Sequence, residues 1–207
     1  MKAIFASVLA LYAATPALAE TVVMTFDGVA GDYTAFDDTL GDSTHVDVTN
    51  DTLYGFGSAG VYESHLEHWT NNYSGLTDIA FPSASGRVGQ LAFGIDAGYE
   101  LTFDSFDFGN YFDGSTARDA SFRIYDAAWG LVWSSDVTGH TGAAVTMTPG
   151  VAITGTGYFQ WGSDWNIGID NFAYSVAEIT PAVPLPAGLP LLLAGLTGFG
   201  VLRRRKS

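Results

Sequence analysis

The central part of the chain, from Glu20 to Glu178, alternates short apolar runs with turn-forming residues. The runs are rich in Val, Thr, Phe, Tyr and Trp, and Gly, Asp, Asn and Ser separate them. This composition is typical of strands and turns, because β-branched and aromatic side chains pack well on a pleated surface. No stretch sustains an apolar stripe of helical spacing for three turns, so long helices are not expected. The predicted strands are Thr21–Phe26, His45–Val48, Val61–Glu63, Val88–Ile95, Tyr99–Phe108, Ala120–Tyr125, Leu131–Ser134, Ala143–Met147, Tyr158–Trp161 and Ile167–Val176.

Ten short strands with turn signals between them predict an all-β domain, an antiparallel β-sandwich of the jelly-roll kind. Within Tyr99–Phe108 the apolar alternation through Leu101 and Phe103 loses phase before Phe106, as a β-bulge would cause. The segment Ser64–Tyr73 is the one place where a helical turn is considered. About 160 residues are enough for one domain to bury its own core without disulfides.

Charge and cysteine content exclude several classes of function. The 207-residue chain has no cysteine, which removes thiol catalysis and thiolate metal sites. All 22 acidic residues lie between Glu20 and Glu178, where the basic residues are Arg87, Arg118 and Arg123, so this region has a formal charge of −19. Nucleic acid is therefore not expected as a partner. The acidity favours solubility and could also attract divalent cations, calcium above all.

The N-terminus has the pattern of a secretory signal peptide. Met1-Lys2 is a short positive region, Ala3–Ala14 is apolar, and Ala17-Leu18-Ala19 is a small-x-small cleavage site. We therefore predict a signal peptide over residues 1–19, a β-sandwich domain over 20–178 and a C-terminal tail over 179–207.

The tail combines a Pro-rich motif, an apolar segment and a basic end. The 18 residues Leu185–Leu202 carry no charge and would reach roughly 27 Å as a helix, close to the ~30 Å of a hydrocarbon core. They are predicted to form a transmembrane helix. Because positive residues stay on the cytoplasmic side, the bulk of the chain is expected on the opposite side. The motif consists of Val183, Pro184, Leu185, Pro186 and Ala187, and the basic end of Arg203, Arg204, Arg205 and Lys206.

These tail residues resemble the C-terminal sorting signals of Gram-negative bacteria known as PEP-CTERM, in the VPLPA-CTERM variant, which Val183–Ala187 matches letter for letter. The resemblance implies recognition by an exosortase, a membrane-embedded transpeptidase-like enzyme, and cleavage near the motif. It further implies a transient inner-membrane anchor, a final place in the cell envelope, at the cell surface or outside the cell, and a frequent association with exopolysaccharide. The alternative is an ordinary C-terminal membrane anchor.

Two short strings resemble the opening and closing strands of carbohydrate-binding and lectin-like jelly rolls. They are Thr25-Phe26-Asp27-Gly28 and Ile167-Gly168-Ile169-Asp170-Asn171-Phe172. Many proteins of that kind hold a structural calcium ion between an early acidic residue and an Asp of the last strand, which would correspond to Asp27 and Asp170 here. Carboxylate and turn carbonyl oxygens are suitable calcium ligands. Alternatively, Asp170-Asn171 forms a turn that hydrogen-bonds nearby backbone amides.

Five tryptophans and ten tyrosines offer flat apolar faces on which sugar rings can stack, although most should be core. Trp165, within Gly162-Ser163-Asp164-Trp165-Asn166, and Trp69, close to Asn71 and Asn72, have polar neighbours. These two tryptophans are the candidates for a glycan-binding surface, with packing at the domain edge as the alternative.

Two strings resemble catalytic motifs without the context that those motifs need. His65-Leu66-Glu67-His68 is one residue short of the zinc protease helix motif, and Gly55–Gly60 matches a dinucleotide fingerprint without a following helix. We therefore predict an exported cell-surface protein that is not an enzyme and binds glycan or exopolysaccharide through a calcium-stabilised β-sandwich. The alternatives are a structural or adhesive envelope protein and, third, a secreted hydrolase.

Overall fold

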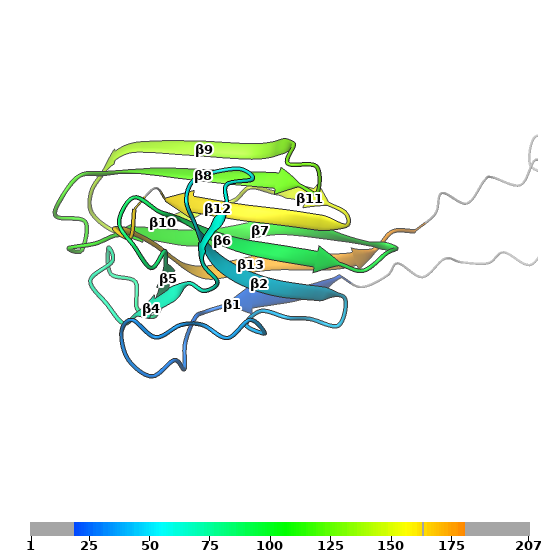
Figure 1. Ribbon diagram of the computed structural model, residues 1–207, viewed down its shortest axis with the longest axis horizontal. Helices are drawn as coiled ribbons and strands as arrows, with labels where there is room; N and C mark the ends of the chain where they lie inside the picture. Colours follow the sequence, from blue (N-terminus) through cyan, green and yellow to red (C-terminus); the bar gives the residue numbers. More distant parts are fainter. Residues whose placement is uncertain (1–18, 163, 181–207) are drawn as a thin grey trace, which may run out of the picture.

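The computed structural model describes residues 19–162 and 164–180, and this part of the chain consists of β-strands, turns and loops (Figure 1). The strands are β1 (Glu20–Met24), β2 (Val46–Leu53), β3 (Val61–Glu63), β4 (Glu67–Trp69), β5 (Ile79–Phe81), β6 (Val88–Ile95), β7 (Tyr99–Asn110), β8 (Arg118–Asp126), β9 (Leu131–His140), β10 (Val145–Met147), β11 (Val151–Ile153), β12 (Thr156–Gly162) and β13 (Ile167–Glu178).

The strands form two antiparallel sheets. Sheet A has the order β10-β7-β13-β5-β4, with β1 also paired to β13 and β11 to β7, and sheet B has the order β3-β2-β6-β12-β8-β9. The chain crosses repeatedly between the sheets, for example from β6 in sheet B to β7 in sheet A. The predicted β-sandwich is therefore confirmed.

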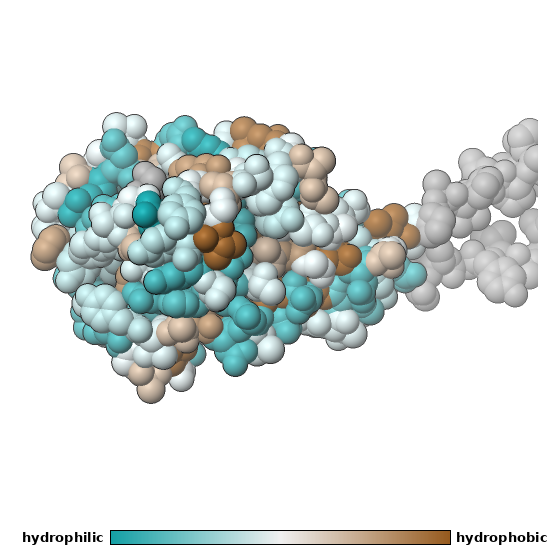
Figure 2. Space-filling model, in the orientation of Figure 1, coloured by the Kyte–Doolittle hydropathy of each residue, from teal (hydrophilic) through white to brown (hydrophobic). Residues whose placement is uncertain are grey.

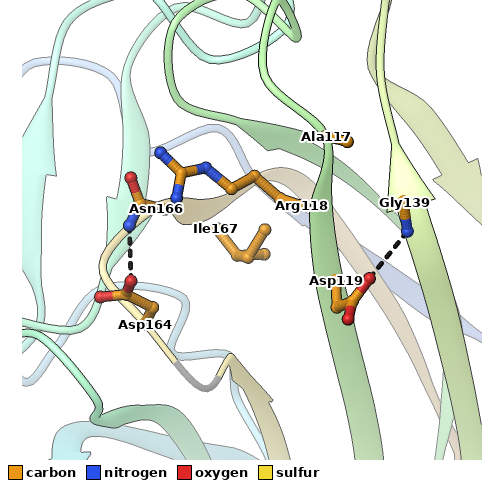
Figure 3. Close-up of a pocket in the computed structure, with 7 residues that line it drawn as sticks. All are labelled: Ala117, Arg118, Asp119, Gly139, Asp164, Asn166 and Ile167. Carbon is orange, nitrogen blue, oxygen red and sulfur yellow. Dashed lines mark hydrogen bonds between the residues drawn. The ribbon is translucent and has the colours of Figure 1, made fainter.

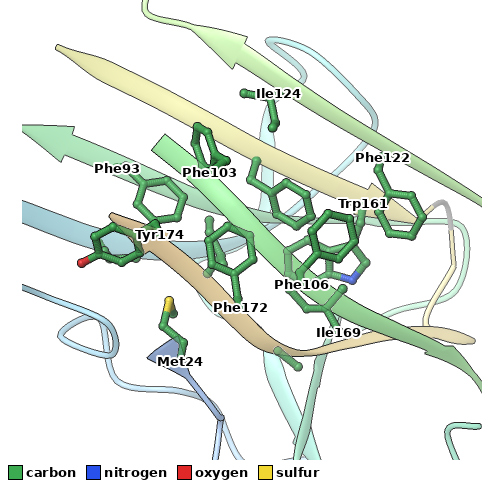
Figure 4. Close-up of a cluster of buried hydrophobic side chains, with 14 of the residues drawn as sticks. Met24, Phe93, Phe103, Phe106, Phe122, Ile124, Trp161, Ile169, Phe172 and Tyr174 are labelled. Atoms are coloured by element: carbon green, nitrogen blue, oxygen red, sulfur yellow. The ribbon is translucent and has the colours of Figure 1, made fainter. Parts of the chain in front are cut away.

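Aromatic side chains from both sheets fill the space between them (Figure 4). Phe106 of β7 lies 4.7 Å from Phe159 of β12 and 5.0 Å from Phe122 of β8, measured between ring centroids, and it is stacked at 6.2 Å on Phe172 of β13. Each of these rings is at most 1% exposed. Fully burying a Phe side chain contributes roughly 1.5–3 kcal/mol, so this cluster supplies much of the stability of a cysteine-free domain.

The predicted β-bulge is present, and the first and last strands are neighbours, as predicted. The register between β7 and β13 shifts around Ala173, where Ser105 and then Phe103 are the successive partners on β7. The shift lets both Phe103 and Phe106 face the core. β1 pairs with β13 from Glu20 opposite Val176 to Met24 opposite Phe172, which places Asp27 beyond the end of a strand that borders β13.

Several sequence predictions need correction. The segment Ser64–Tyr73 contains the strand β4 instead of a helical turn, because β4 pairs with β5 and Glu67 also bridges to Ala35. β2 continues past its predicted end at Val48. Its polar residues Asn50 and Thr52 are buried, where Asn50 Oδ1 accepts from the Leu66 N–H (2.7 Å) and Thr52 Oγ1 donates to His65 O (2.8 Å).

Polar residues cover most of the face seen in Figure 2, and apolar side chains lie there in small separate patches. In the part that the structure describes, no helix is long and apolar enough to cross a membrane. Residues 1–18 of the predicted signal peptide, the Val183–Ala187 motif, the transmembrane helix and the basic end at Arg203–Lys206 lie outside the described residues.

Candidate functional site

Trp69 and Trp165, the two tryptophans selected from the sequence, line the same pocket, which has a volume of about 250 Å³. Trp69 is the last residue of β4, and Trp165 lies in the loop that precedes β13. Phe81, the last residue of β5, and Tyr33, from the loop between β1 and β2, complete the aromatic lining, and Ser83–Ser85 provide the polar part. We call this the aromatic pocket.

The rings of the aromatic pocket are packed edge to face. The centroid of Tyr33 lies 5.0 Å from that of Trp69 at an interplanar angle of 84°, and both rings are 6.3 Å from Phe81. Tyr111 lies 5.8 Å from Trp69 and 5.0 Å from Trp165 and so links the two indoles from behind. Such contacts fix the ring planes, so the pocket presents preformed apolar faces.

Backbone contacts hold these aromatic residues from segments far apart in the sequence. The Tyr33 N–H donates to His68 O (2.9 Å), which attaches its loop to β4. The Tyr73 hydroxyl donates to Trp165 O (2.6 Å) and fixes the loop before β13. Burial raises the pKa of Tyr73 far above its usual range, so this hydroxyl remains a donor.

The side chains that line the aromatic pocket differ in their exposure to solvent. Tyr33 is 67% exposed, whereas Trp69 and Trp165 are half-buried and pack against a small cluster of Tyr73, Ile79 and Phe81. The indoles thus pack at the edge of the domain and also line the pocket. The Trp69 Nε1–H has no acceptor among the described residues.

Asp170, the second candidate from the sequence, is only 6% exposed on the β13 bulge. Its Oδ1 accepts from the Asn171 N–H (2.6 Å), and Asn171 has a positive φ of 49°. Burial, together with the negative charges of Asp27, Asp107 and Asp78, raises the pKa of Asp170 to about 7. The hydrogen bond to a nearby backbone amide, expected as the alternative, is present, but both residues lie within β13 and not in a turn. The charge of Asp27 acts on Asp170.

The carboxylates near Asp170 differ in the hydrogen bonds that they already accept. Asp107 accepts from Asn171 Nδ2 (2.9 Å), and Asp78 pairs with His68 Nε2 (2.9 Å). Asp27 accepts no hydrogen bond from a described residue. Across the described residues no group of three or more His, Cys, Asp or Glu side chains is arranged to hold a metal ion. Any cation here would need backbone oxygens besides Asp27 and Asp170.

The two motif-like strings serve structural roles. His68 is fully buried, and its Nδ1 lies 3.0 Å from Gly31 O while its Nε2 faces Asp78, so neither ring nitrogen is available to a metal. In Gly55–Gly60, the N–H and C=O of Gly57 both bond to the Gln160 side chain, at 2.8 and 2.9 Å. This loop is held against the outer face of sheet B.

No known family model matches the chain, and no curated protein matches it. Among solved structures, the chain is similar to the Podospora anserina GH26-CBM35 beta-(1,4)-mannanase, with 14% identity and a TM-score of 0.34 over 66% of this chain and 29% of that one. It is also similar to a CBM4 structure, with 14% identity and a TM-score of 0.31 over 61% of this chain and 79% of that one. The family 11 carbohydrate-binding module of Clostridium thermocellum, in complex with a beta-1,3-1,4-mixed-linked tetrasaccharide, gives 12% identity and a TM-score of 0.24 over 72% and 95%. The chain thus spans less than a third of the mannanase.

Proposed function

We propose that the domain binds glycan at the aromatic pocket and that it binds without catalysing a reaction. The observation that carries this proposal is the convergence of Trp69 and Trp165 with the exposed Tyr33 around one open pocket. Flat rings offer apolar surface to the C–H faces of sugars, and the exposed Ser85 offers hydrogen bonds to hydroxyl groups.

The charge of the domain favours uncharged glycans. With a formal charge of −19 between Glu20 and Glu178, the domain repels anionic polymers at low ionic strength. Neutral polysaccharides, or acidic ones bridged by calcium, are therefore the ligands that we expect for a jelly-roll-like domain of this composition.

We also propose that calcium stabilises the sandwich between Asp27 and Asp170. The donors are oxygen atoms, as calcium requires, and Asp170 is a buried carboxyl surrounded by like charges that a cation would compensate. The bound ion would supply positive charge and cross-link the segment after β1 to β13. Loop carbonyl oxygens would have to complete its coordination.

The terminal segments support a proposal about location. A signal peptide over residues 1–19 and the VPLPA-type tail would direct the protein through an exosortase system to the cell surface or the extracellular matrix. There it would meet exopolysaccharide.

Removal of the tail gives a first prediction. Protein extracted from the cell surface is expected to lack the residues after the Val183–Ala187 motif, since the motif, apolar segment and Arg-rich end together form a processing signal. Mass spectrometry of the intact protein measures this. Exported protein that still ends at Ser207 would instead indicate a permanent membrane anchor.

Truncation of one pocket tryptophan gives a second prediction. Trp165→Ala is expected to weaken binding to a neutral polysaccharide by about 1–2 kcal/mol, since it removes one stacking face. Affinity electrophoresis in gels cast with neutral or uronate-rich polymers, with and without calcium, measures the retardation.

Trp129→Ala is the matched control. Trp129 stacks on Tyr158 with centroids 4.0 Å apart, outside the aromatic pocket, so its removal should leave retardation unchanged. No retardation of the wild type in any gel would reject glycan binding and favour a structural or adhesive envelope role. Release of reducing sugar from a polymer would instead favour a hydrolase.

A further inference from the structure

A second pocket of about 400 Å³ opens between the start of β8 and the loop that leads into β13 (Figure 3). We call it the polar pocket. Arg118 extends from β8 across Ile167 toward Asn166 on one side, and Asp119 lies with Gly139 on the other. The loop residues Asp164 and Asn166 line the polar pocket, while Trp165 between them lines the aromatic pocket.

Arg118 differs from the other two arginines of the described domain. Arg87 lies 4.9 Å and 4.5 Å from the ring centroids of Tyr54 and Tyr62, and Arg123 is 2.7 Å from Asp136. Arg118 has neither a carboxylate within 4.0 Å nor an aromatic ring against its guanidinium in the described ranges, and its buried Nε, like that of Arg87, has no hydrogen-bond acceptor there. The Arg118 side chain as a whole is partly exposed at the pocket, so its guanidinium can donate to an occupant that supplies an acceptor oxygen.

Asn166 provides an unsatisfied acceptor beside this donor. The residue is 5% exposed, and its Nδ2 donates to Asp164 Oδ2, which fixes the orientation of the amide. The Asn166 Oδ1 is buried and receives no hydrogen bond within the described part of the chain. Asp164 Oδ1 in turn accepts from the Trp165 N–H (2.8 Å), so the loop itself is held in place.

Asp119 adds an accessible acceptor on the other side. Its Oδ1 accepts from the Gly139 N–H (2.8 Å), and the exposed carboxylate retains a second oxygen. The polar pocket therefore combines a guanidinium donor with amide and carboxylate acceptors. Sugar hydroxyl groups both donate and accept, so neighbouring hydroxyls can satisfy both kinds of group. One arginine and two aspartates give the lining a formal charge of −1, which disfavours an anionic ligand.

We propose that the polar pocket binds the terminal residue of a neutral glycan through neighbouring hydroxyls, with the Arg118 guanidinium donating and the exposed Asp119 carboxylate accepting, beside Asn166. The size supports one end residue, since a volume of about 400 Å³ is near the lower end of the usual range for small-molecule pockets. This inference rests on the proposed glycan function and adds a second subsite that recognises chain ends.

The test uses the full ¹⁵N-labelled chain and free monosaccharides. Glucose, galactose and mannose are titrated in turn, followed by glucuronate and galacturonate, while the Arg118 Nε–H and Asn166 side-chain NMR signals are recorded. At least one neutral sugar is expected to shift both signals at millimolar concentration, and the uronates should bind about tenfold or more weakly.

Arg118→Gln is expected to weaken monosaccharide binding about tenfold or more, and Asp119→Asn provides a second, surface-exposed variant. Arg123→Gln is the matched control, because Arg123 lies on the same strand but outside the polar pocket, and it should bind as the wild type does. Trp165→Ala should be retarded less by polysaccharide, while the monosaccharide still shifts the Arg118 signal.

The outcomes of these measurements distinguish a glycan site at the polar pocket from one at the aromatic pocket. If no sugar shifts the Arg118 signal while polysaccharide still retards the protein, the polar pocket is not a glycan subsite and the aromatic pocket remains. Equal binding by Arg118→Gln, by Asp119→Asn and by the wild type, or tighter binding of uronates, also overturns the inference. If monosaccharides bind at Arg118 but Trp165→Ala has no effect on polysaccharide, the assignment of the aromatic pocket is wrong.

Discussion

Without calcium, the folded protein is expected to lose about 3 kcal/mol of stability between pH 5 and pH 8 because of Asp170 alone. This carboxyl is nearly fully buried, and burial together with the charges of Asp27, Asp107 and Asp78 raises its pKa from 3.8 to about 7. The unfolded chain releases the proton near pH 4, whereas the folded chain keeps it until about pH 7. The stabilisation by Asp170 is therefore fully present below pH 4 and is lost as the pH rises through 7.

Thermal unfolding in a chelating buffer at pH 5, 6, 7 and 8 measures this effect for the wild type and for Asp170→Asn. The variant cannot ionise at this position, so it should be the more stable protein at pH 8 and show a shallower dependence on pH. Asp47→Asn is the matched control, because it removes the same charge from an exposed position on β2. An unchanged pH dependence in Asp170→Asn would show that other groups cause it, and the raised pKa of Asp51 and Glu67 makes them the next candidates.

Calcium at millimolar concentration should reverse the loss. An ion that binds only the folded state stabilises it by mass action, and it competes with the proton for the Asp170 carboxylate. The gain in Tm should thus be large at pH 8, small at pH 5 and absent in Asp170→Asn. An equal gain in the wild type and the variant would place the ion elsewhere, and no gain at pH 8 would leave Asp170 with its hydrogen-bonding role only.

The strands that could be predicted from sequence are those in which local alternation matches burial. In β6, Leu91, Phe93 and Ile95 face the core, and both ends of the strand agree with the prediction. β5 and β11 have three residues each, too few to show a period, and all three residues of β5 are buried. β11 pairs with β7, and β5 pairs with β4 and at one position with β13, so no pattern within three residues could reveal them.

Only some residues of the candidate site could be predicted from the sequence. Trp69 and Trp165 stand beside polar residues, and that local signal selected them as candidates; the sequence did not indicate that both line one pocket. Tyr33 and Phe81 carry no such signal, because contacts between distant segments bring them to the pocket. The proximity of Asp27 and Asp170 was predictable, because it requires only that the first and last strands be neighbours, which the pairing of β1 with β13 confirms.

The buried side chain of His68 joins the loop after β1 to β4, and its removal is the second change from which we expect a large effect. The imidazole of His68 is fully buried between Gly31 O, 3.0 Å from Nδ1, and Asp78 Oδ1, 2.9 Å from Nε2. It thereby ties the loop after β1 to β4 and to the residue before β5. The same loop carries Tyr33, whose N–H donates to the backbone oxygen of His68.

His68→Ala is expected to destabilise the protein by roughly 3–5 kcal/mol, since it opens a cavity and leaves the Asp78 carboxylate and the Gly31 carbonyl without their partner. At about 2–4 °C per kcal/mol for a domain of this size, Tm should fall by roughly 10 °C. His45→Ala is the control, because the His45 side chain is 31% exposed, pairs with the exposed Asp96 at 3.2 Å and stacks on Tyr99 near the surface. Its loss should cost less than about 1 kcal/mol. If both variants unfold within a degree or two of the wild type, the buried imidazole does not hold these segments together, and the shape of the aromatic pocket must depend on the ring contacts of Tyr33, Trp69 and Phe81 alone.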